Sequence, residues 1–223
     1  MKRCLGRAIL ACVLVAAVGP SAWAGPPTDQ IRDRVDRIVK VLEDPDLQKE
    51  SRTPERRSTI RRIAEELFDF TEISQRSLGR HWQARTPAER GEFVALFGGL
   101  LSDVYISRIE AYSGERILYI SEAVDDDYVT VRTRIVTKQG PEIPMDYRMF
   151  RREDRWRVFD ASIEGVSLVA NYRSQFNSVV QRSSYQELVT RLRTKQEESP
   201  GARATGRRGD SDQAKPPPSP QTP

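Results

Sequence analysis

Apolar and polar residues in the first half of the chain recur with the period of an α-helix. Apolar positions three or four residues apart form a stripe in four successive stretches, which predicts helices over about residues 31–42, 54–68, 69–78 and 87–112. Thr53 and Thr86 each precede a proline, so we expect both threonines to cap a helix. Glu89 completes a capping box after Thr86, which makes the start of the fourth helix the clearest of the four.

Two adjacent glycines, Gly98 and Gly99, lie in the middle of the long fourth helix. A glycine inside a helix costs about 1 kcal/mol relative to alanine, so two in succession suggest a reason. Either another backbone or a ligand comes close to the helix there, or the glycines only thin its surface. The sequence leaves both interpretations open.

From about residue 116 the period changes to the two-residue alternation of β-strands. Four segments joined by short turns predict an antiparallel meander, with strands over residues 116–123, 128–138, 141–151 and 155–163. One predicted face is apolar and carries Val129, Val131, Ile135, Ile143, Met145, Tyr147, Met149, Trp156 and Val158. The other is polar and carries Arg132, Arg134, Asp146, Arg148 and Arg157. Such a sheet is typically covered by helices on its apolar face.

The last part of the domain returns to a helical pattern. Gly165 interrupts the strand pattern, and then Val169, Tyr172 and Phe176 share one helical face, which we expect to cover the sheet. A second capping box begins at Ser184 and predicts a final helix. Helices, a four-stranded antiparallel sheet and helices again, in that order, indicate an α+β fold.

The two ends of the chain differ from the domain between them. Residues 1–24 have the positive start, the short apolar run and the small-x-small ending of a secretory signal peptide, which implies export to a bacterial periplasm. Both cysteines, Cys4 and Cys12, lie in this segment, so we expect a mature chain without a disulfide or a thiolate metal site. Residues 199–223 are rich in proline and lack large apolar side chains, which is typical of a disordered tail. Residues 25–198 then form one α+β domain.

Charge and motifs exclude several function classes. The chain carries a net charge of +4, and loss of the signal peptide leaves about +1, so nucleic acid is not an expected partner. The chain has one histidine, His81, and we expect neither catalytic nor metal-binding residues. Two alternatives stay open. One is a small enzyme with Asp160 or Asp146 as base and Tyr147 as acid; the other is an adaptor whose apolar faces only fill a core.

Asp160 is the carboxylate that the pattern makes most conspicuous, because it falls in line with Trp156 and Val158 on the fourth strand. A carboxylate near an apolar face can have a raised pKa and act as a general base. We expect instead that it caps the turn at Gly165 or pairs with an arginine.

Several sequence motifs resemble one known family. The motifs are Phe68-Asp69-Phe70, Leu78-Gly79-x-x-Trp82, the helical stripe Phe93/Phe97/Leu101/Tyr105, Trp156-x-Val158-x-Asp160, Gly165-Val166-Ser167-Leu168 and Asn171-Tyr172-Arg173-Ser174-Gln175-Phe176. Together they resemble the MlaC family of periplasmic phospholipid-binding proteins, also called toluene-tolerance proteins. A hopanoid-associated branch, HpnM, is similar. The resemblance covers about residues 28–196.

The resemblance implies a fold related to nuclear transport factor 2, with an apolar cavity between sheet and helices, and a carrier rather than an enzyme. Its cargo would be a phospholipid or related lipid, with no cofactor. It implies a monomer that shuttles lipid between an outer-membrane lipoprotein complex and an inner-membrane ABC-type transporter with an MCE protein, which maintains outer-membrane lipid asymmetry. The lipid and the direction of transport stay undetermined.

The resemblance and the apolar faces together predict the residues around the acyl chains. They are Phe97, Leu101, Tyr105, Val131, Tyr147, Trp156, Val158, Val166, Val169 and Tyr172.

Overall fold

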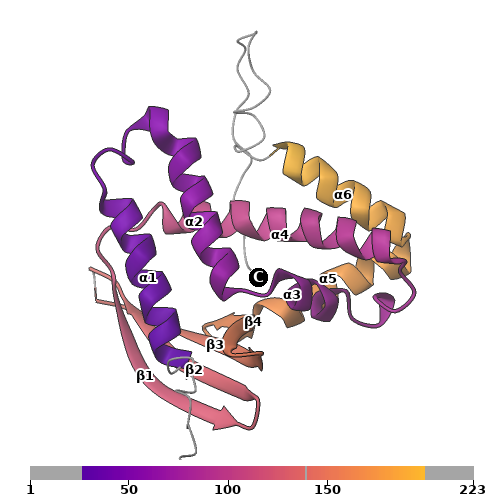
Figure 1. Cartoon of the computed structure of the whole chain (residues 1–223). Helices are drawn as coiled ribbons and strands as arrows, with labels where there is room; N and C mark the ends of the chain where they lie inside the picture. The colour runs from indigo at the N-terminus through magenta and orange to yellow at the C-terminus, as the bar shows by residue number, and fades with distance from the viewer. Residues whose placement is uncertain (1–26, 139, 199–223) are drawn as a thin grey trace, which may run out of the picture.

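The computed structural model describes residues 27–138 and 140–198. The predicted signal peptide and the predicted tail lie outside these residues. The amino-terminal half is helical, as the sequence predicts, with α1 (Pro27–Glu43), α2 (Thr53–Leu67), α3 (Phe70–Leu78) and α4 (Pro87–Ile109). Two short 3₁₀ turns, η1 (Glu50–Arg52) and η2 (Gly79–His81), join α1 to α2 and follow α3 (Figure 1).

The starts of the helices confirm most of the predicted caps. The Thr86 hydroxyl accepts from the Glu89 backbone N–H at 3.2 Å, and the Glu89 carboxylate accepts from the Thr86 N–H at 2.8 Å, which completes the capping box. Ser184 caps α6 (Tyr185–Glu198) by accepting from the Glu187 N–H at 3.0 Å. Thr53 does not cap α2. It lies inside the first turn of that helix, and Arg52 precedes it without a side-chain cap.

The strands form one antiparallel sheet in the order of the chain. They are β1 (Arg116–Asp125), β2 (Tyr128–Val136), β3 (Glu142–Arg152), β4 (Arg155–Ile163) and β5 (Val166–Ser167). The meander is confirmed, but the sequence prediction missed β5. Glu164 and Gly165 have φ values of 51° and 81°, so they form a two-residue hairpin turn that folds β5 back onto β4.

The sheet has an inner face and an outer face. The inner face carries Val129, Val131, Tyr147, Met149 and Val158, and the cross-strand pairs place these residues side by side. The outer face carries Arg132, Arg134, Asp146 and Arg148, as predicted. Helices α1 and α2 pack over the inner face, so the predicted division into an apolar and a polar side is correct.

A β-bulge in β4 changes which residues share a face. Phe159 is an extra residue relative to β3, so the alternation of side chains shifts after Val158. Asp160 consequently lies opposite Arg148, on the outer face. The prediction that Asp160 continues the line of Trp156 and Val158 is therefore wrong, because a strict two-residue period leaves no place for the extra residue.

The apolar interior is divided into two clusters. The helical core is formed by α3, α4, α5 (Leu168–Arg182) and α6, and the sheet core by α1, α2 and the inner face of the sheet. Phe68 packs against both clusters, because residues 68 and 69 run beside β4 and the Asp69 N–H donates to the Val158 carbonyl at 2.9 Å. We predicted that α5 covers the sheet, and this prediction is wrong. Helix α5 packs on α3, α6 and the end of β4, and its apolar residues join the helical core.

The carboxylate of Asp160 connects the sheet to α5. It is 2% exposed and accepts from the Ser167 hydroxyl at 2.6 Å and from the Val169 N–H at 3.0 Å. An Arg148 guanidinium nitrogen lies 3.5 Å from the same carboxylate. Asp160 therefore has a structural role at the start of α5 and an arginine partner, in agreement with our expectation.

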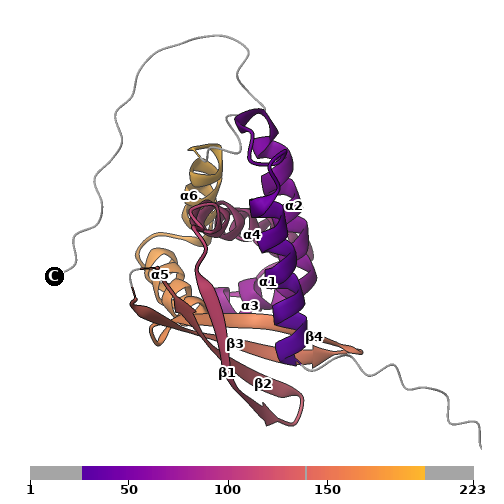
Figure 2. The same ribbon diagram turned by 90° about the vertical axis from the view of Figure 1, so that its left-hand side faces the viewer.

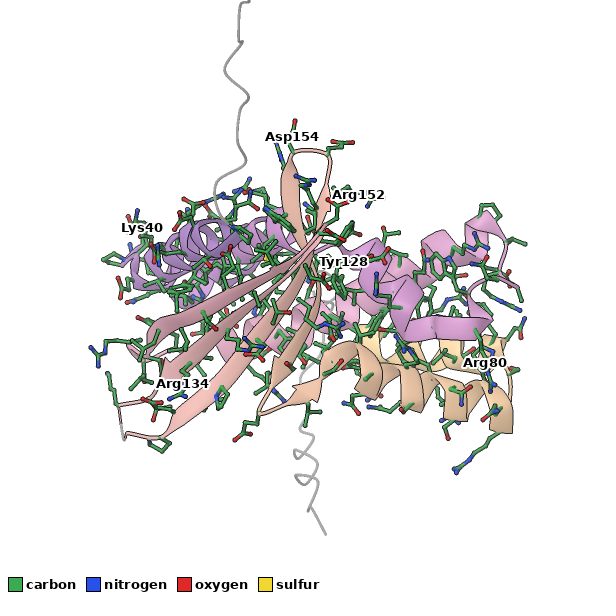
Figure 3. All side chains as sticks on the ribbon, turned by 90° about the horizontal axis from the view of Figure 1, so that it is seen from below. Lys40, Arg80, Tyr128, Arg134, Arg152 and Asp154 are labelled. Atoms are coloured by element: carbon green, nitrogen blue, oxygen red, sulfur yellow. The ribbon has the colours of Figure 1, made fainter. Side chains whose placement is uncertain are left out.

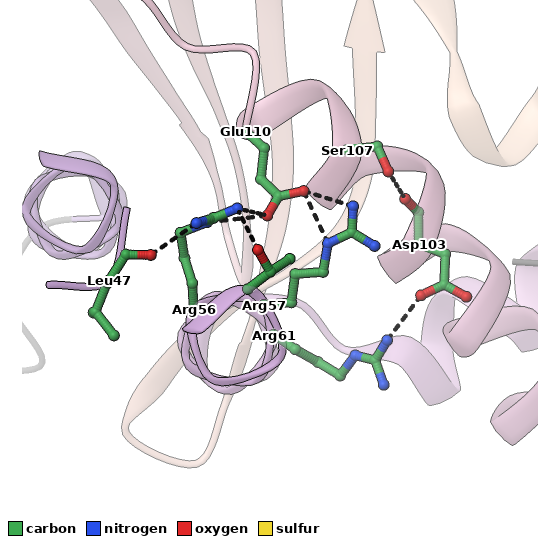
Figure 4. Close-up of polar contacts among 8 residues, drawn as sticks. Leu47, Arg56, Arg57, Arg61, Asp103, Ser107 and Glu110 are labelled. Carbon is green, nitrogen blue, oxygen red and sulfur yellow. Dashed lines mark hydrogen bonds and ion pairs between the residues drawn. The ribbon is translucent and has the colours of Figure 1, made fainter. Parts of the chain in front are cut away.

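A cluster of arginines and carboxylates clamps α2 to the end of α4 (Figure 4). Glu110 accepts from Arg56 at 2.8 Å and from Arg57 at 2.7 Å, and Arg56 also donates to the Leu47 carbonyl at 2.7 Å. About two turns earlier in α4, Asp103 pairs with Arg61 at 2.9 Å. Burial raises the pKa of Glu110, but the hydrogen bonds from the two arginines outweigh this effect, so the pKa lies below its ordinary value.

We expect Asp160→Asn to lower the free energy of unfolding by about 2 kcal/mol, because charge-assisted hydrogen bonds at a buried position are lost. Urea unfolding monitored by tryptophan fluorescence measures this change. Asp146→Asn is the matched control on the same sheet face, where no hydrogen bond or ion pair of Asp146 is observed among the described residues, and it should change stability by less than about 0.5 kcal/mol. Equal effects of the two substitutions would contradict the capping role.

We expect Glu110→Gln to lower the free energy of unfolding by about 1–2 kcal/mol at pH 7, less than for a fully buried pair because water reaches the cluster. Since the folded pKa of Glu110 lies below its ordinary value of 4.5, this stabilisation is complete above about pH 4.5 and is lost as the pH falls through the folded pKa. Unfolding curves at pH 7 and pH 3 should therefore differ for wild type more than for the variant. Glu65→Gln, an exposed position on α2, should have no such effect.

Candidate functional site

The ten residues predicted to surround a lipid lie in two separate places. Five belong to the helical core: Phe97, Leu101, Tyr105, Val169 and Tyr172. Four belong to the sheet core: Val131, Tyr147, Trp156 and Val158. Val166 belongs to neither; it follows the Gly165 turn and is 62% exposed. The structure therefore arranges nine of the residues as two apolar surfaces, and whether they contact lipid stays a prediction.

The helical surface is built mainly from aromatic rings. The Phe97 ring lies 4.9 Å from the Tyr172 ring and 4.9 Å from the Phe176 ring, in edge-to-face geometry that favours aromatic pairs. Tyr105 and Tyr172 are half-buried, and burial raises the pKa of both hydroxyls. Leu168 and Val104 are also half-buried at this surface.

The sheet surface includes residues that the sequence analysis did not select. Tyr119 and Met145 are half-buried and pack against the sheet core beside Tyr147. The sequence analysis did not select Tyr119 because β1 carries apolar side chains on both of its faces. A β-bulge after Tyr119 further interrupts the two-residue alternation, so the sequence pattern does not define an inner face of β1. Phe68 belongs to one of the motifs shared with the MlaC family, but it was not selected as a site residue. Its position between the two cores arises because the chain at this residue runs beside β4, which the sequence pattern does not reveal.

Helix α4 crosses above the sheet without packing closely on it. Its main contacts are with α2, α3 and α6, whereas the inner face of the sheet is contacted chiefly by α1 and α2. Figure 2 shows α4 above the sheet, with α1 and α2 along one side and α5 at the other. The half-buried apolar residues of the helical surface lie on α4 and α5, and those of the sheet surface lie on β1, β3 and β4.

Gly98 and Gly99 of α4 lie next to side chains of neighbouring helices. A Cβ atom on Gly98 would lie 3.6 Å from the Phe70 ring of α3, and one on Gly99 would lie 3.0 Å from the Gln196 side chain of α6. A Cβ on Gly98 would thus make an ordinary van der Waals contact, and one on Gly99 would meet the end of a flexible side chain. The described residues do not show the close approach of another backbone, and the other interpretations stay open.

A half-open depression of about 350 Å³ lies on the outer face of the sheet. It is lined by Arg76, Ala123, Asp125, Tyr128, Val129, Thr130, Arg148, Met149 and Phe159. Figure 3 shows this face, with Tyr128 and Arg152 toward the β3–β4 hairpin and Arg134 toward the other end of the strands. Guanidinium groups of Arg76 and Arg148 lie 4.2 Å and 5.2 Å from the centre of the Phe159 ring. The depression is bordered by charged side chains and is partly open to water.

The polar residues considered for catalysis do not come together. Asp160 and Asp146 lie on the outer face, whereas Tyr147 lies on the inner face, so neither carboxylate can share a site with this hydroxyl. The His81 ring lies 3.0 Å from the Asn177 side-chain oxygen, a contact that connects η2 to α5. Within residues 27–138 and 140–198, no three His, Cys, Asp or Glu side chains are grouped as a metal site would need.

The helices of the described ranges were also compared with what a membrane span requires. None of them is both long enough and apolar enough to cross a bilayer.

Comparisons with known proteins agree with the sequence motifs. The family model described as MlaC protein matches residues 32–194. The intermembrane phospholipid transport system binding protein MlaC of Haemophilus influenzae is 22% identical over 120 residues, which span 52% of this chain and 56% of that protein. The match thus covers only about half the length of this curated relative.

A solved structure shares the fold. It is the phospholipid-binding protein from Ralstonia solanacearum in complex with a phospholipid, and it superposes with a TM-score of 0.67 over 76% of this chain and 96% of that chain, at 24% identity. The α+β architecture described above is therefore a known one. Because the family model covers most of the folded domain, and because the resemblance found in the motifs is confirmed, this chain belongs to the MlaC family.

Proposed function

We propose that this protein is a lipid carrier that binds the acyl chains of a phospholipid between the inner face of the sheet and the helical core. Membership of the MlaC family and the fold shared with a protein that holds a phospholipid support this function. In this proposal the acyl chains lie beneath α4, among half-buried residues that include Tyr105, Trp156 and Tyr172, and the buried members of the predicted set pack behind them.

The division of the interior into two clusters is the observation that carries the proposal. A domain of this size usually buries one contiguous core, whereas here the two clusters meet chiefly through Phe68. Half-buried aromatic and methionine side chains border both clusters, including Tyr105 and Tyr172 on one side and Tyr119 and Met145 on the other. Apolar surfaces that face each other without packing together suit an apolar ligand, and methionine suits an adaptable wall.

The energetics fit a passive carrier. Two acyl chains contain roughly 28 methylenes, and each contributes about 0.8 kcal/mol on leaving water, which gives on the order of 20 kcal/mol. A free lipid therefore almost never crosses water alone. A bilayer offers the same burial, so transfer between membrane and protein is nearly balanced, and any direction of flow must come from the partners.

The partners and the location belong to the same proposal. The name of the Haemophilus influenzae relative places that protein in an intermembrane phospholipid transport system. We propose that this chain works in the periplasm and exchanges lipid with an outer-membrane lipoprotein complex and with an inner-membrane ABC-type transporter carrying an MCE protein, and so maintains outer-membrane lipid asymmetry. No chemical reaction is part of this function, and the separation of Asp160 and Asp146 from Tyr147 supports a carrier over an enzyme.

We expect the protein, purified from a bacterial periplasm without detergent, to retain one phospholipid per chain. Native mass spectrometry followed by solvent extraction identifies the bound molecule. A hopanoid in its place would keep the carrier function and change the cargo. A ligand-free mass that does not change after incubation with phospholipid vesicles would contradict the proposal and favour an adaptor with a filled core.

We expect Tyr105→Glu to reduce the bound phospholipid at least about tenfold, because a carboxylate beneath α4 would have to lose its water to acyl chains. The variant should still fold, since Tyr105 is only half-buried and Arg108 lies over its ring at 5.6 Å, where it can pair with the new charge. Native mass spectrometry of the purified variant gives the lipid occupancy, and circular dichroism gives the melting temperature.

Tyr128→Glu is the matched control for this experiment. Tyr128 is 48% exposed and lies on the outer face, so the same substitution should leave the bound lipid unchanged. A loss of lipid in both variants, or in neither, would place the site elsewhere. Val131 and Val158 are fully buried in the sheet core, so charges there would report on folding rather than on the site.

A further inference from the structure

Two tyrosine hydroxyls lie on the inner face of the sheet, where most of the neighbouring side chains are apolar. Tyr119 is half-buried there, and the Arg32 guanidinium lies 4.7 Å from the centre of its ring. Tyr119 on β1 and Tyr147 on β3 both project from the inner face, on either side of β2. The Tyr119 hydroxyl oxygen is shielded from water and has no hydrogen-bond partner among the described residues. The Tyr147 hydroxyl has only the Met145 sulfur, at 3.4 Å.

Both hydroxyls remain hydrogen-bond donors at any physiological pH. Burial raises the pKa of Tyr119 to about 12, and the nearby Asp36 adds to this effect, while Arg32 opposes it. Burial, reinforced by Tyr119, likewise holds the pKa of Tyr147 well above its ordinary value. The two side chains project from the same face of the sheet, one on each strand that flanks β2.

An unsatisfied donor in an apolar core is unfavourable, so a retained one calls for an explanation. A thioether is a weak acceptor, and the nearby Thr133 hydroxyl already donates to the Met145 carbonyl at 2.7 Å. Within the described part of the chain, neither tyrosine hydroxyl therefore has a strong acceptor. Phenylalanine would pack as well at both positions without this cost.

We propose that Tyr119 and Tyr147 form a polar subsite that donates hydrogen bonds to the ester carbonyl oxygens of a glycerophospholipid. This inference rests on the proposed lipid-carrier function and specifies the lipid class. Ester carbonyls lie where the acyl chains join the glycerol, so they accompany the chains into an apolar site. Ester carbonyls are uncharged hydrogen-bond acceptors, so they suit the two neutral tyrosine donors. An ionised phosphate in the same place would lose its hydration, which costs much free energy.

The subsite would distinguish lipids by their linkage rather than by their chain length. A diether lipid has the same chains and head group as its diester counterpart but no carbonyl acceptor. A hopanoid hydrocarbon skeleton also lacks it. A buried donor left unpaired by the wrong ligand is a strong source of selectivity.

The experiment is a competition. The full chain is incubated with vesicles that contain equal amounts of dipalmitoyl phosphatidylglycerol and its dihexadecyl ether analogue, and native mass spectrometry measures which lipid is bound. We expect wild type to take up the diester in about tenfold excess, as two hydrogen bonds of ordinary strength predict. The double variant Tyr119→Phe, Tyr147→Phe should bind as much total lipid with a diester-to-ether ratio near one.

Controls separate this inference from the function on which it rests. Tyr128→Phe removes a hydroxyl from the outer face and should keep the tenfold preference. The Tyr119→Phe single variant should be at least as stable as wild type without lipid and should show an intermediate ratio. A ratio near one for wild type, or an unchanged preference in the double variant, overturns the ester subsite while lipid binding stands. If wild type takes up neither lipid, the proposed carrier function itself fails.

Discussion

The hydrogen bonds of the buried Asp160 carboxylate fix the position of the helical core relative to the sheet, because they hold the start of α5 against β4. The carboxylate sits at the end of β4 and holds the start of α5, the helix that carries Val169 and Tyr172 into the helical core. A carboxylate this deeply buried is stable only when its oxygens are occupied, and here a hydroxyl, a backbone N–H and Arg148 occupy them. The bulge at Phe159 turns Asp160 to the outer face, so the helix start is secured from outside the apolar interior and leaves the inner face free of charge.

Much of the fold follows from local patterns, and the candidate site follows only in part. Helix stripes, caps and two-residue alternation predicted the order of helices and strands and the inner face of β2 and β3, because each depends on residues close in sequence. The bulge at Phe159 and the strand β5 were not predictable in this way, since one inserted residue and a two-residue pairing leave no periodic signal. The same limit explains Val166: its place in a motif and its apolar side chain suggested a buried residue, but the hairpin turn exposes it.

The two-core arrangement was also beyond sequence reasoning. An apolar stripe on a helix or strand indicates that its side chains are buried, but it does not indicate which element they pack against. Phe97 and Val131 have equally apolar patterns, yet one packs among aromatic rings of helices and the other beneath α1 and α2. Only long-range contacts, such as those that place residues 68 and 69 beside β4, determine which core each apolar residue joins.

Facing apolar surfaces attract each other in water, so something must hold them apart in a carrier. We interpret the charged clusters at the edges of the domain as this support. Glu110 with Arg56 and Arg57 fixes the end of α4 against α2 (Figure 4). Asp160 fixes the start of α5 from the outer face of the sheet. The net contribution of such clusters to the free energy of unfolding is small, because desolvation of the charges offsets their attraction. Their geometry is nevertheless specific, and removal of one partner destabilises the fold because a buried charge is left unpaired. A passive lipid carrier needs supports of specific geometry at the edges of its site. If the apolar walls packed against each other instead, that packing would compete with binding of the lipid.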